Sequence, residues 1–274
     1  MTTTSITGAN RGLGHEIARR LIEAGQTVWR GARDAENGRR AADRLGAGFV
    51  QLDVTDDASV AAAVETLRAR AGHLAVLVNN AGTLGEVTAP EDMTADRIRH
   101  VHETNVFGLA RLTHAFLPLL RAAALPSVVN VTSGLGPFTL TQEPERVESR
   151  CPLAAHGSSK SAVTMLTTQY ARTIPDVRFN AVDPGQTATE FTGRIGHSVE
   201  EGAEAAVRIA TLGPDTPTGT VTDRTGALPW WDPAPVRWSC ARVRMRDTAV
   251  SPARAAKPHD LPTVLTDSAA DPAG

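Results

Sequence analysis

Short apolar runs alternate with stretches of helical spacing along most of the chain. Strands are predicted at residues 2–7, 27–32, 49–54, 74–78, 127–132 and 177–183, and a short one near 219–222. The run at 74–78 is apolar throughout, which is typical of a central parallel strand covered on both faces. Between the strands, apolar residues recur at helical spacing, as at Ile17, Ala18, Leu21 and Ile22. The pattern predicts an α/β protein.

The predicted helices fill the intervals between these strands. One follows Gly14 and ends at Gly25, and a charged helix ends at Leu45. Residues 94–120 read as helices interrupted around 105–108, and residues 152–169 and 201–210 are also helical in spacing. The helix after the third strand is expected to bury a face formed by Ala58, Ala62, Val64 and Leu67.

A glycine-rich turn joins the first strand to the first helix. It reads Thr7-Gly8-x-x-x-Gly12-x-Gly14, with Asn10 inside the turn. Glycines let the backbone approach a pyrophosphate closely, and a helix N-terminus offers free N–H groups and the positive end of its dipole. The turn therefore predicts a nucleotide-binding fold, namely a Rossmann-type doubly wound parallel sheet of about seven strands with helices on both faces.

Composition and charge limit the binding partners and the cellular location that this fold is expected to have. The 274 residues carry a formal net charge of −2 and a pI near 6.5, which argues against binding to nucleic acid or to a membrane surface. Two cysteines cannot form a disulfide framework, and the chain shows neither a signal peptide nor an apolar run of the roughly 20 residues that span a bilayer. We therefore expect a cytoplasmic protein without a metal site, and the excess of arginine over lysine suggests a GC-rich bacterial gene.

Residues 232–274 differ from the rest of the chain. They are rich in Ala, Pro and Arg and show no sustained period of 2 or 3.6 residues, so we expect this tail to be disordered. Residues 1–231 are expected to form one domain that contains both the nucleotide site and the active site.

Three motifs together resemble the short-chain dehydrogenase/reductase family, over about residues 3–231. They are TGANRGLG near the start, VNVTSG at 129–134 and PLAAHGSSKSAVTMLTTQ at 152–169. The active-site helix of that family begins Tyr-x-x-x-Lys. Here the spacing is kept, but the tyrosine position holds His156 and the lysine is Lys160, one of two lysines in the chain.

The resemblance assigns roles to individual positions. It implies that Asn105, Ser133, His156 and Lys160 are catalytic, with Thr132 a weaker candidate than Ser133. It also implies a set of cofactor-binding residues: Gly8, Asn10, Arg11, Gly12, Leu13, Gly14, Arg33, Asp53, Val54, Asn79, Ala81, Gly82, Lys160, Pro184, Gly185 and Thr187.

The end of the second strand decides which dinucleotide is expected. In the family, an acidic side chain there binds the 2′-hydroxyl of NAD, whereas this chain has Ala32 followed by Arg33. Arg33 and Arg11 favour a 2′-phosphate, so NADP(H) is predicted over NAD(H). Asp34 is the contrary feature. The Ala32-Arg33 pair and a long loop at 134–155, with Leu135, Phe138 and Leu140 as candidate substrate-lining residues, most resemble the carbonyl-reductase branch.

His156 changes the expected chemistry. Its reference pKa of about 6.5 suits proton transfer, but the ammonium of Lys160 would push the imidazole towards its neutral form. The imidazole also reaches roughly 2 Å less far than a tyrosine hydroxyl. Tyr170, the only tyrosine, lies ten positions after Lys160 and cannot replace it.

Three functions remain open on the sequence. The leading one is an NADP(H)-dependent oxidoreductase for a small carbonyl or alcohol substrate, with His156 as the proton donor and with activity expected to be reduced by the loss of the tyrosine. The others are a cyclase or isomerase that uses His156 as an acid–base group, and a protein that binds NADP(H) without catalysis. The family resemblance also suggests a homodimer or homotetramer.

Two residues interrupt strands that should be apolar. Ser5 lies in the first strand and Arg30 in the second. Either relaxed selection or side chains turned towards a polar cavity would explain them.

Overall fold

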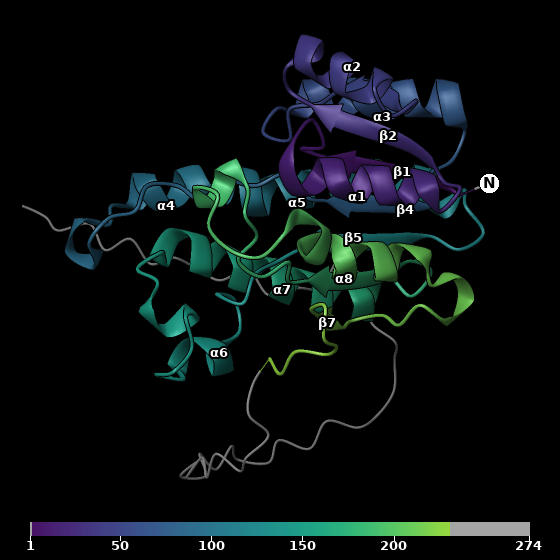
Figure 1. Cartoon of the computed structure of the whole chain (residues 1–274). Coiled ribbons are helices and arrows are strands. Elements are labelled where there is room, and N and C mark those ends of the chain that lie inside the picture. Colours follow the sequence, from purple (N-terminus) through teal and green to yellow (C-terminus); the bar gives the residue numbers. More distant parts are fainter. Residues whose placement is uncertain (1, 231–274) are drawn as a thin grey trace, which may run out of the picture. The chain divides into compact units, whose positions relative to one another are not determined.

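A single parallel sheet is the central layer of the computed structural model, which describes residues 2–230 (Figure 1). Within these residues the sheet has the order β3-β2-β1-β4-β5-β6-β7, and every neighbouring pair is parallel. Its strands are β1 (Thr3–Thr7), β2 (Thr27–Ala32), β3 (Gly48–Gln51), β4 (Val76–Asn79), β5 (Ser127–Val131), β6 (Arg178–Val182) and β7 (Val221–Thr222). Trp231 and the predicted tail 232–274 lie outside the described residues.

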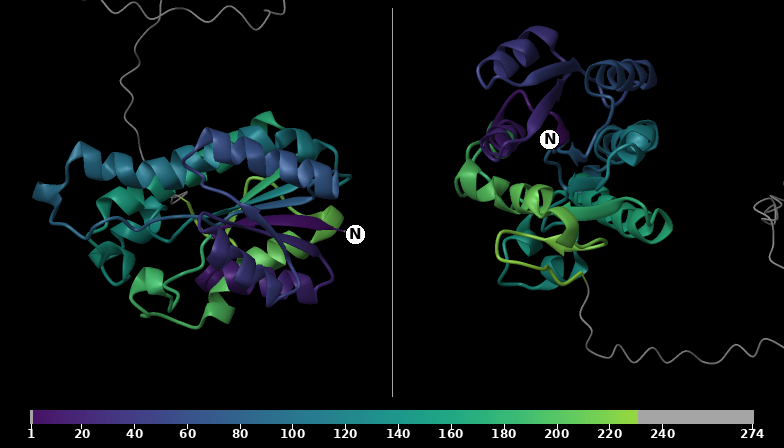
Figure 2. Two further views of the ribbon diagram at one scale, coloured as in Figure 1. Left: turned by 90° about the horizontal axis from the view of Figure 1, so that it is seen from above. Right: turned by 90° about the vertical axis from the view of Figure 1, so that its right-hand side faces the viewer.

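Helices cover both faces of the sheet (Figure 2). α1 and α8 pack on one face, whereas α3, α5 and α7 pack on the other. The helices are α1 (Gly12–Glu23), α2 (Ala35–Asp43), α3 (Asp57–Ala71), α4 (Ala95–His102), α5 (Gly108–Arg121), α6 (Phe138–Gln142), α7 (Ala154–Thr173) and α8 (Val199–Thr211). The predicted Rossmann-type doubly wound fold is confirmed. No helix in the described part of the chain is long and apolar enough to cross a membrane.

Two local predictions were wrong. The third strand ends at Gln51, so Asp53 and Val54 follow the strand and do not close it. α3 buries the stripe Val60, Ala63, Val64 and Leu67, and it leaves Ala58 and Ala62 exposed. Positions 60, 63, 64 and 67 lie on one side of a helix with 3.6 residues per turn, whereas alanine is small enough to be tolerated on either side.

The interruption predicted around residue 105 is confirmed. A π-helical segment, Glu103–Phe107, separates α4 from α5 and contains the buried Asn105. Such segments occur mostly as single turns inside α-helices and frequently at functional sites.

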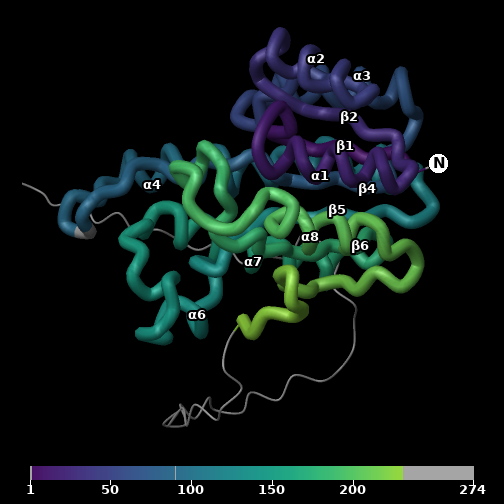
Figure 3. Tube along the Cα trace, in the orientation of Figure 1, coloured from purple at the N-terminus to yellow at the C-terminus, as the bar shows by residue number. Residues whose placement is uncertain are grey.

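The carboxyl ends of the strands meet at one edge of the sheet. The winding reverses between β1 and β4, which is where open α/β sheets bind ligands. The segments that follow β1, β4, β5 and β6 converge at this edge (Figure 3).

Candidate active site

The glycine-rich turn after β1 packs tightly against the segment that follows β4. Gly8 has a φ of 64°, and a Cβ on it would lie 3.0 Å from the Cα of Ala81. A Cβ on Gly14 would lie 2.5 Å from Asn80 Nδ2. Asn80 Nδ2 in turn donates to the carbonyl oxygens of Thr7 (2.9 Å) and Gly8 (3.2 Å). Asn80 thus fixes the turn, and it was not among the predicted residues, although it lies inside the predicted motif.

The start of α1 offers its N–H groups to a ligand. Arg11 precedes the helix and, within the described residues, its side chain does not cap the first turn. Gly12 has a φ of 53°, and a Cβ on it would meet only Thr189 Cγ2, at 3.5 Å. A glycine cradle with an uncapped helix N-terminus suits the pyrophosphate of a dinucleotide. Gly8, Gly12, Leu13 and Gly14 therefore fit the predicted cofactor.

Residues near the adenosine end of the predicted site are mostly exposed. Arg33 is exposed, and Arg11 is exposed and pairs with Glu190. Asp34, the contrary feature, caps α2: its carboxylate accepts from the backbone N–H of Asn37 at 2.9 Å. That bond and the Asn37 amide lower the pKa of Asp34.

The two residues after β3 are placed differently from each other. Asp53 is partly buried, and its Oδ1 accepts from the backbone N–H and the hydroxyl of Thr55. Val54 is buried, and a Cβ added at Gly108 would lie 2.9 Å from its Cγ2. Val54 is therefore a packing residue between this segment and α5.

The Asn-Asn-Ala-Gly motif after β4 joins the cofactor side of the site to the catalytic side. Asn79 Nδ2 donates to Asn130 Oδ1 at 2.8 Å, and the backbone N–H of Ala81 donates to Thr7 Oγ1 at 2.9 Å. A Cβ on Gly82 would lie 3.3 Å from Asn105 Oδ1 and 3.8 Å from Lys160 Nζ. Glycine at this position therefore lets the chain approach both predicted catalytic residues.

The main chain of Thr83 brings two predicted catalytic residues together. Asn105 Oδ1 accepts from the Thr83 N–H at 2.8 Å, and Asn105 Nδ2 donates to the Thr83 carbonyl at 2.9 Å. His156 Nδ1 lies 3.2 Å from the same carbonyl oxygen. A carbonyl oxygen can only accept, so Nδ1 carries the proton and Nε2 keeps its lone pair in the neutral ring.

Burial sets the charge states at this site. Lys160 lies one turn after His156 on α7 and donates from Nζ to the Val131 carbonyl at 2.8 Å. Burial lowers the pKa of Lys160 to about 8, and Asp183 opposes this shift. The pKa of His156 is lowered to about 4, mainly by burial and secondly by the charge of Lys160. The hydrogen bond to Thr83 raises this pKa by a smaller amount. His156 is therefore neutral at pH 7, as the sequence suggested.

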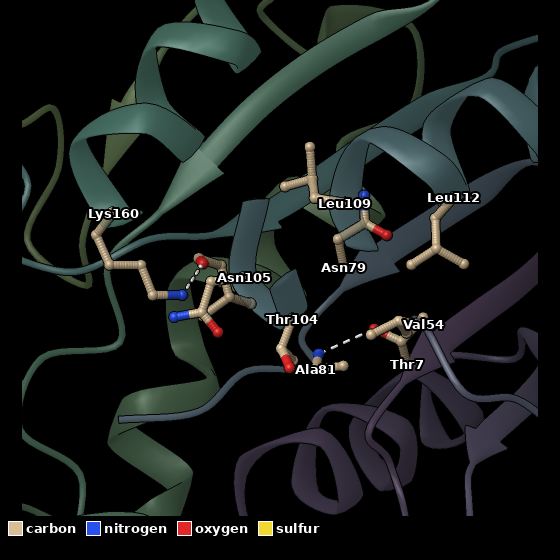
Figure 4. Close-up of a pocket in the computed structure, with 10 residues that line it drawn as sticks. Thr7, Val54, Asn79, Ala81, Thr104, Asn105, Leu109, Leu112 and Lys160 are labelled. Atoms are coloured by element: carbon tan, nitrogen blue, oxygen red, sulfur yellow. Dashed lines mark hydrogen bonds between the residues drawn. The ribbon is translucent and has the colours of Figure 1, made fainter. Parts of the chain in front are cut away.

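A small polar cavity lies next to Lys160 and Asn105 (Figure 4). Its volume is about 10 Å³, close to the space that one water molecule needs, and Thr7 and Asn79 also line it. Asn79 Oδ1 is buried and has no partner among the described residues. A water molecule here would satisfy that oxygen.

Ser133 and Thr132, which follow β5, make different contacts. The hydroxyl of Ser133 accepts from the Leu135 N–H at 3.2 Å, and the side chain is partly exposed. The buried hydroxyl of Thr132 bonds the Lys160 carbonyl (3.1 Å) and Thr164 (2.9 Å), which is a structural role on α7. Ser133 therefore remains the better catalytic candidate.

The long loop after Ser133 contains the short helix α6 and brings a carboxylate to the site. In this loop Leu140 is buried, and Phe138 is exposed and lies 6.4 Å from the ring of Trp230. A Cβ on Gly134 would lie 2.7 Å from Glu148 Oε1 and 3.1 Å from Asp183 Oδ2. Burial raises the pKa of Asp183. Asp183 was missed because it reads as the last polar residue of a strand.

The segment after β6 lies across the glycine turn. The buried Thr187 donates to the Pro184 carbonyl at 3.0 Å, and Gly185 has a φ of 63°. Thr187 is committed to its own loop, whereas Thr189 lies over Gly12. The next residues carry Phe191, whose ring lies 5.7 Å from the ring of His156, edge-on. Thr189 is thus nearer to the glycine turn than the predicted Thr187.

Tyr170 takes no part in this site. Its ring packs 5.4 Å from that of Phe179 in the core cluster of α3, α5 and α7.

Known proteins support the identification of this fold. A family model described as short chain dehydrogenase matches residues 2–200. A short-chain dehydrogenase of Penicillium roqueforti is 37% identical over 222 residues, covering 76% of this chain and 88% of that protein. The (+)-neomenthol dehydrogenase of Arabidopsis thaliana is 31% identical over 280 residues, covering 80% and 95% respectively.

A solved structure of similar fold is the NADPH-bound carbonyl reductase from chicken fatty liver. It superposes with a TM-score of 0.76 at 24% identity, over 84% of this chain and 99% of that one. At this identity the likeness concerns the fold alone. The two curated relatives above are fungal and plant proteins, so they lend no support to a bacterial origin.

Proposed function

Because the chain belongs to the short-chain dehydrogenase family, a family of oxidoreductases, we propose that it is an NADP(H)-dependent member acting on a small organic substrate. The substrate carbon is a carbonyl in one direction and an alcohol in the other. When bound, the nicotinamide supplies or takes the hydride at that carbon. The chain's own residues hold the substrate oxygen and move the proton.

One observation carries this proposal: the Thr83 carbonyl accepts from both Asn105 Nδ2 and His156 Nδ1. This contact leaves the lone pair of the neutral ring on Nε2, and we propose that Nε2 exchanges a proton with the substrate oxygen. Ser133 is the proposed hydrogen-bond partner of that oxygen. Lys160 adds a buried positive charge one turn away on α7.

The protonation state of His156 sets the pH dependence in each direction. Alcohol oxidation needs a neutral ring that accepts the proton, whereas carbonyl reduction needs the imidazolium to donate one. The pKa of His156 is lowered to about 4. We therefore expect kcat/KM for reduction to rise as the pH falls from 8 towards 4. We expect kcat/KM for oxidation to be level from about pH 5 to about pH 7 and to fall as Lys160, with its pKa of about 8, loses its charge.

The proposed preference for NADP(H) rests on charge at the adenosine end. Arg11 and Arg33 are exposed cations, Ala32 offers no carboxylate, and Asp34 is engaged as the cap of α2. Arg33→Asp should weaken NADPH at least tenfold relative to NADH, measured by fluorescence titration. Arg70→Asp on α3 makes the same charge change away from the turn and should leave the ratio unchanged. An unchanged ratio in Arg33→Asp would refute the NADP(H) assignment.

The test of the whole proposal is NADPH oxidation and NADP⁺ reduction over a panel of small aldehydes, ketones and alcohols between pH 4.5 and 8. The natural protein, His156→Tyr and His156→Phe are compared. We expect His156→Phe to be inactive and His156→Tyr to lose the rise of reduction at acid pH. Activity of His156→Phe equal to that of the natural protein would show that His156 does not transfer the proton.

The substrate class and the assembly belong to the same proposal. A relative named (+)-neomenthol dehydrogenase acts, by its name, on an alcohol, which makes small apolar alcohols and ketones the first compounds to assay. A homodimer or homotetramer is proposed through the helices around Asn105 and through α7, because Phe107, just before α5, is 48% exposed and Met165 on α7 is 49% exposed. Light scattering would measure the mass of the assembly.

The low cysteine content, with a free Cys151, is the basis for proposing a cytoplasmic location.

A further inference from the structure

Arg30 lies in the middle of β2 and is the largest fully buried side chain among the described residues, with a relative exposure of 1%. Its guanidinium is directed at the glycine-rich turn. Nε donates to the Ala9 carbonyl at 2.8 Å, Nη2 donates to the same oxygen, and Nη1 donates to the Ala41 carbonyl of α2. Arg30 thus joins the turn that follows β1 to the helix that follows β2.

This buried charge has no carboxylate partner in the described part of the chain. The ion pairs among the described residues all involve other side chains, and Arg30 is held by carbonyl oxygens and one histidine. Burial alone lowers its pKa to about 10, so the guanidinium is still charged at pH 7. Buried cations in proteins are usually paired with an anion, because removing a charge from water is costly.

His15 completes the arrangement. Its Nδ1 lies 2.7 Å from Arg30 Nη2, and a guanidinium can only donate, so Nδ1 accepts and the ring proton is on Nε2. Burial and then the Arg30 charge lower the pKa of His15. The other charged groups facing it are Glu16 and Arg19 from α1 and Arg44 from the end of α2. Protonation of His15 would place two cations in contact.

We propose that Arg30 is a positioning residue for the dinucleotide. Its guanidinium binds the Ala9 carbonyl and so fixes the backbone conformation of the turn from Gly8 to Gly14. Its charge, which no carboxylate neutralises, lies next to the turn and attracts the anionic phosphates of the dinucleotide. Neutral His15 is part of this arrangement, because a protonated Nδ1 can no longer accept from Arg30 Nη2 and would push the guanidinium away from the Ala9 carbonyl. We expect this loss of geometry to outweigh the attraction of the added charge for the phosphates, so affinity for the dinucleotide falls as His15 becomes protonated. The inference rests on the proposed function only in taking a nicotinamide dinucleotide as the ligand.

The first arm of the test measures the Kd of NADPH and NADH by fluorescence titration for the natural protein, Arg30→Leu and Arg30→Gln. Glutamine keeps a donor for Ala9 but removes the charge. We expect Arg30→Leu to weaken both dinucleotides roughly tenfold, and Arg30→Gln to weaken them less, at a temperature where circular dichroism shows each variant to be folded. Unchanged Kd values in folded variants would overturn the proposal.

The second arm stays informative even where the Arg30 variants fail to fold. It follows the Kd of NADH from pH 7.5 to 5.5 for the natural protein and for His15→Gln, whose amide oxygen can accept from Arg30 without titrating. NADH is chosen because a 2′-phosphate itself titrates near pH 6. We expect NADH binding to weaken severalfold on acidification in the natural protein and to stay level in His15→Gln. The same pH dependence in both would refute the role of His15.

The two proposals fail in distinguishable ways. If the natural protein binds neither NADPH nor NADH, the proposed function and the role of Arg30 are both refuted. If the natural protein and the Arg30 variants bind these dinucleotides equally well, only the positioning role of Arg30 is refuted.

Discussion

Two buried cations lie at opposite sides of the sheet's ligand edge, and each has a histidine beside it. Arg30 and His15 lie under the glycine-rich turn, whereas Lys160 and His156 lie on the catalytic side. Both cations donate to main-chain carbonyl oxygens, of Ala9 in the first case and Val131 in the second. In both cases burial is the main cause that lowers the pKa of the histidine, and the neighbouring cation is the next largest.

The two pairs differ in which ring nitrogen carries the proton. His15 Nδ1 accepts from Arg30, whereas His156 Nδ1 donates to the Thr83 carbonyl. His15 therefore uses its lone pair on the buried cation, and that lone pair is not available for chemistry. His156 makes its contact through the proton and keeps a lone pair on Nε2. A neutral histidine beside a buried cation can thus be structural or reactive, and the backbone contact decides which.

Lys160→Met is expected to have the largest effect on activity, and it tests whether the two cation–histidine pairs are independent. If Lys160 stabilises the reaction as proposed, removing its charge should lower kcat/KM on the order of 100-fold or more. It should also raise the pKa of His156 from about 4 towards its ordinary value, because one of the two causes that lower it is gone. NMR titration of the His156 ring measures this shift. Arg30→Leu is the matched control, and an equal shift in that variant would mean that the two pairs are not independent.

Much of this architecture was predictable because it follows from local patterns. Apolar runs and helical spacing gave the sheet, and Gly8, Gly12 and Gly14 marked the turn. The interruption of the helices around Asn105 was also predicted, although not its π-helical form. All of these depend on residues close together in the chain, where spacing and backbone preference carry the information.

What could not be predicted depends on contacts between distant segments. Asn80 binding the glycine turn, Thr189 lying over Gly12 and Asp183 beside Glu148 each join parts of the chain far apart in sequence. Arg30 is the clearest case, since an arginine inside a strand reads as an interruption until Ala9, His15 and Ala41 are seen around it. The pairing of such groups is fixed by the tertiary fold.

An effect of similar size concerns stability in acid. The pKa of His156 is depressed in the folded protein, so its contribution to stability is complete above about pH 6.5 and is lost as the pH falls towards 4. With a folded pKa of about 4, that loss is on the order of 3 kcal/mol. Urea denaturation at pH 7 and pH 4.5 should show a smaller loss of unfolding free energy on acidification in His156→Phe than in the natural protein. An equal loss in both would mean that the ring titrates normally when folded.

The smallest effect, and the sharpest separation of the two pairs, is the position of one proton on each ring. Each preference rests on a single hydrogen bond, worth about 1 kcal/mol. We expect ¹⁵N NMR of ring-labelled protein at pH 7.5 to show His156 protonated on Nδ1 and His15 protonated on Nε2, with Lys160→Met leaving the tautomer of His15 unchanged. The signals are assigned by their loss in His156→Phe and His15→Gln. If both rings carry the proton on Nε2, then His156 cannot donate to the Thr83 carbonyl and would have no lone pair on Nε2 for a substrate proton, so the two histidines would share one structural role.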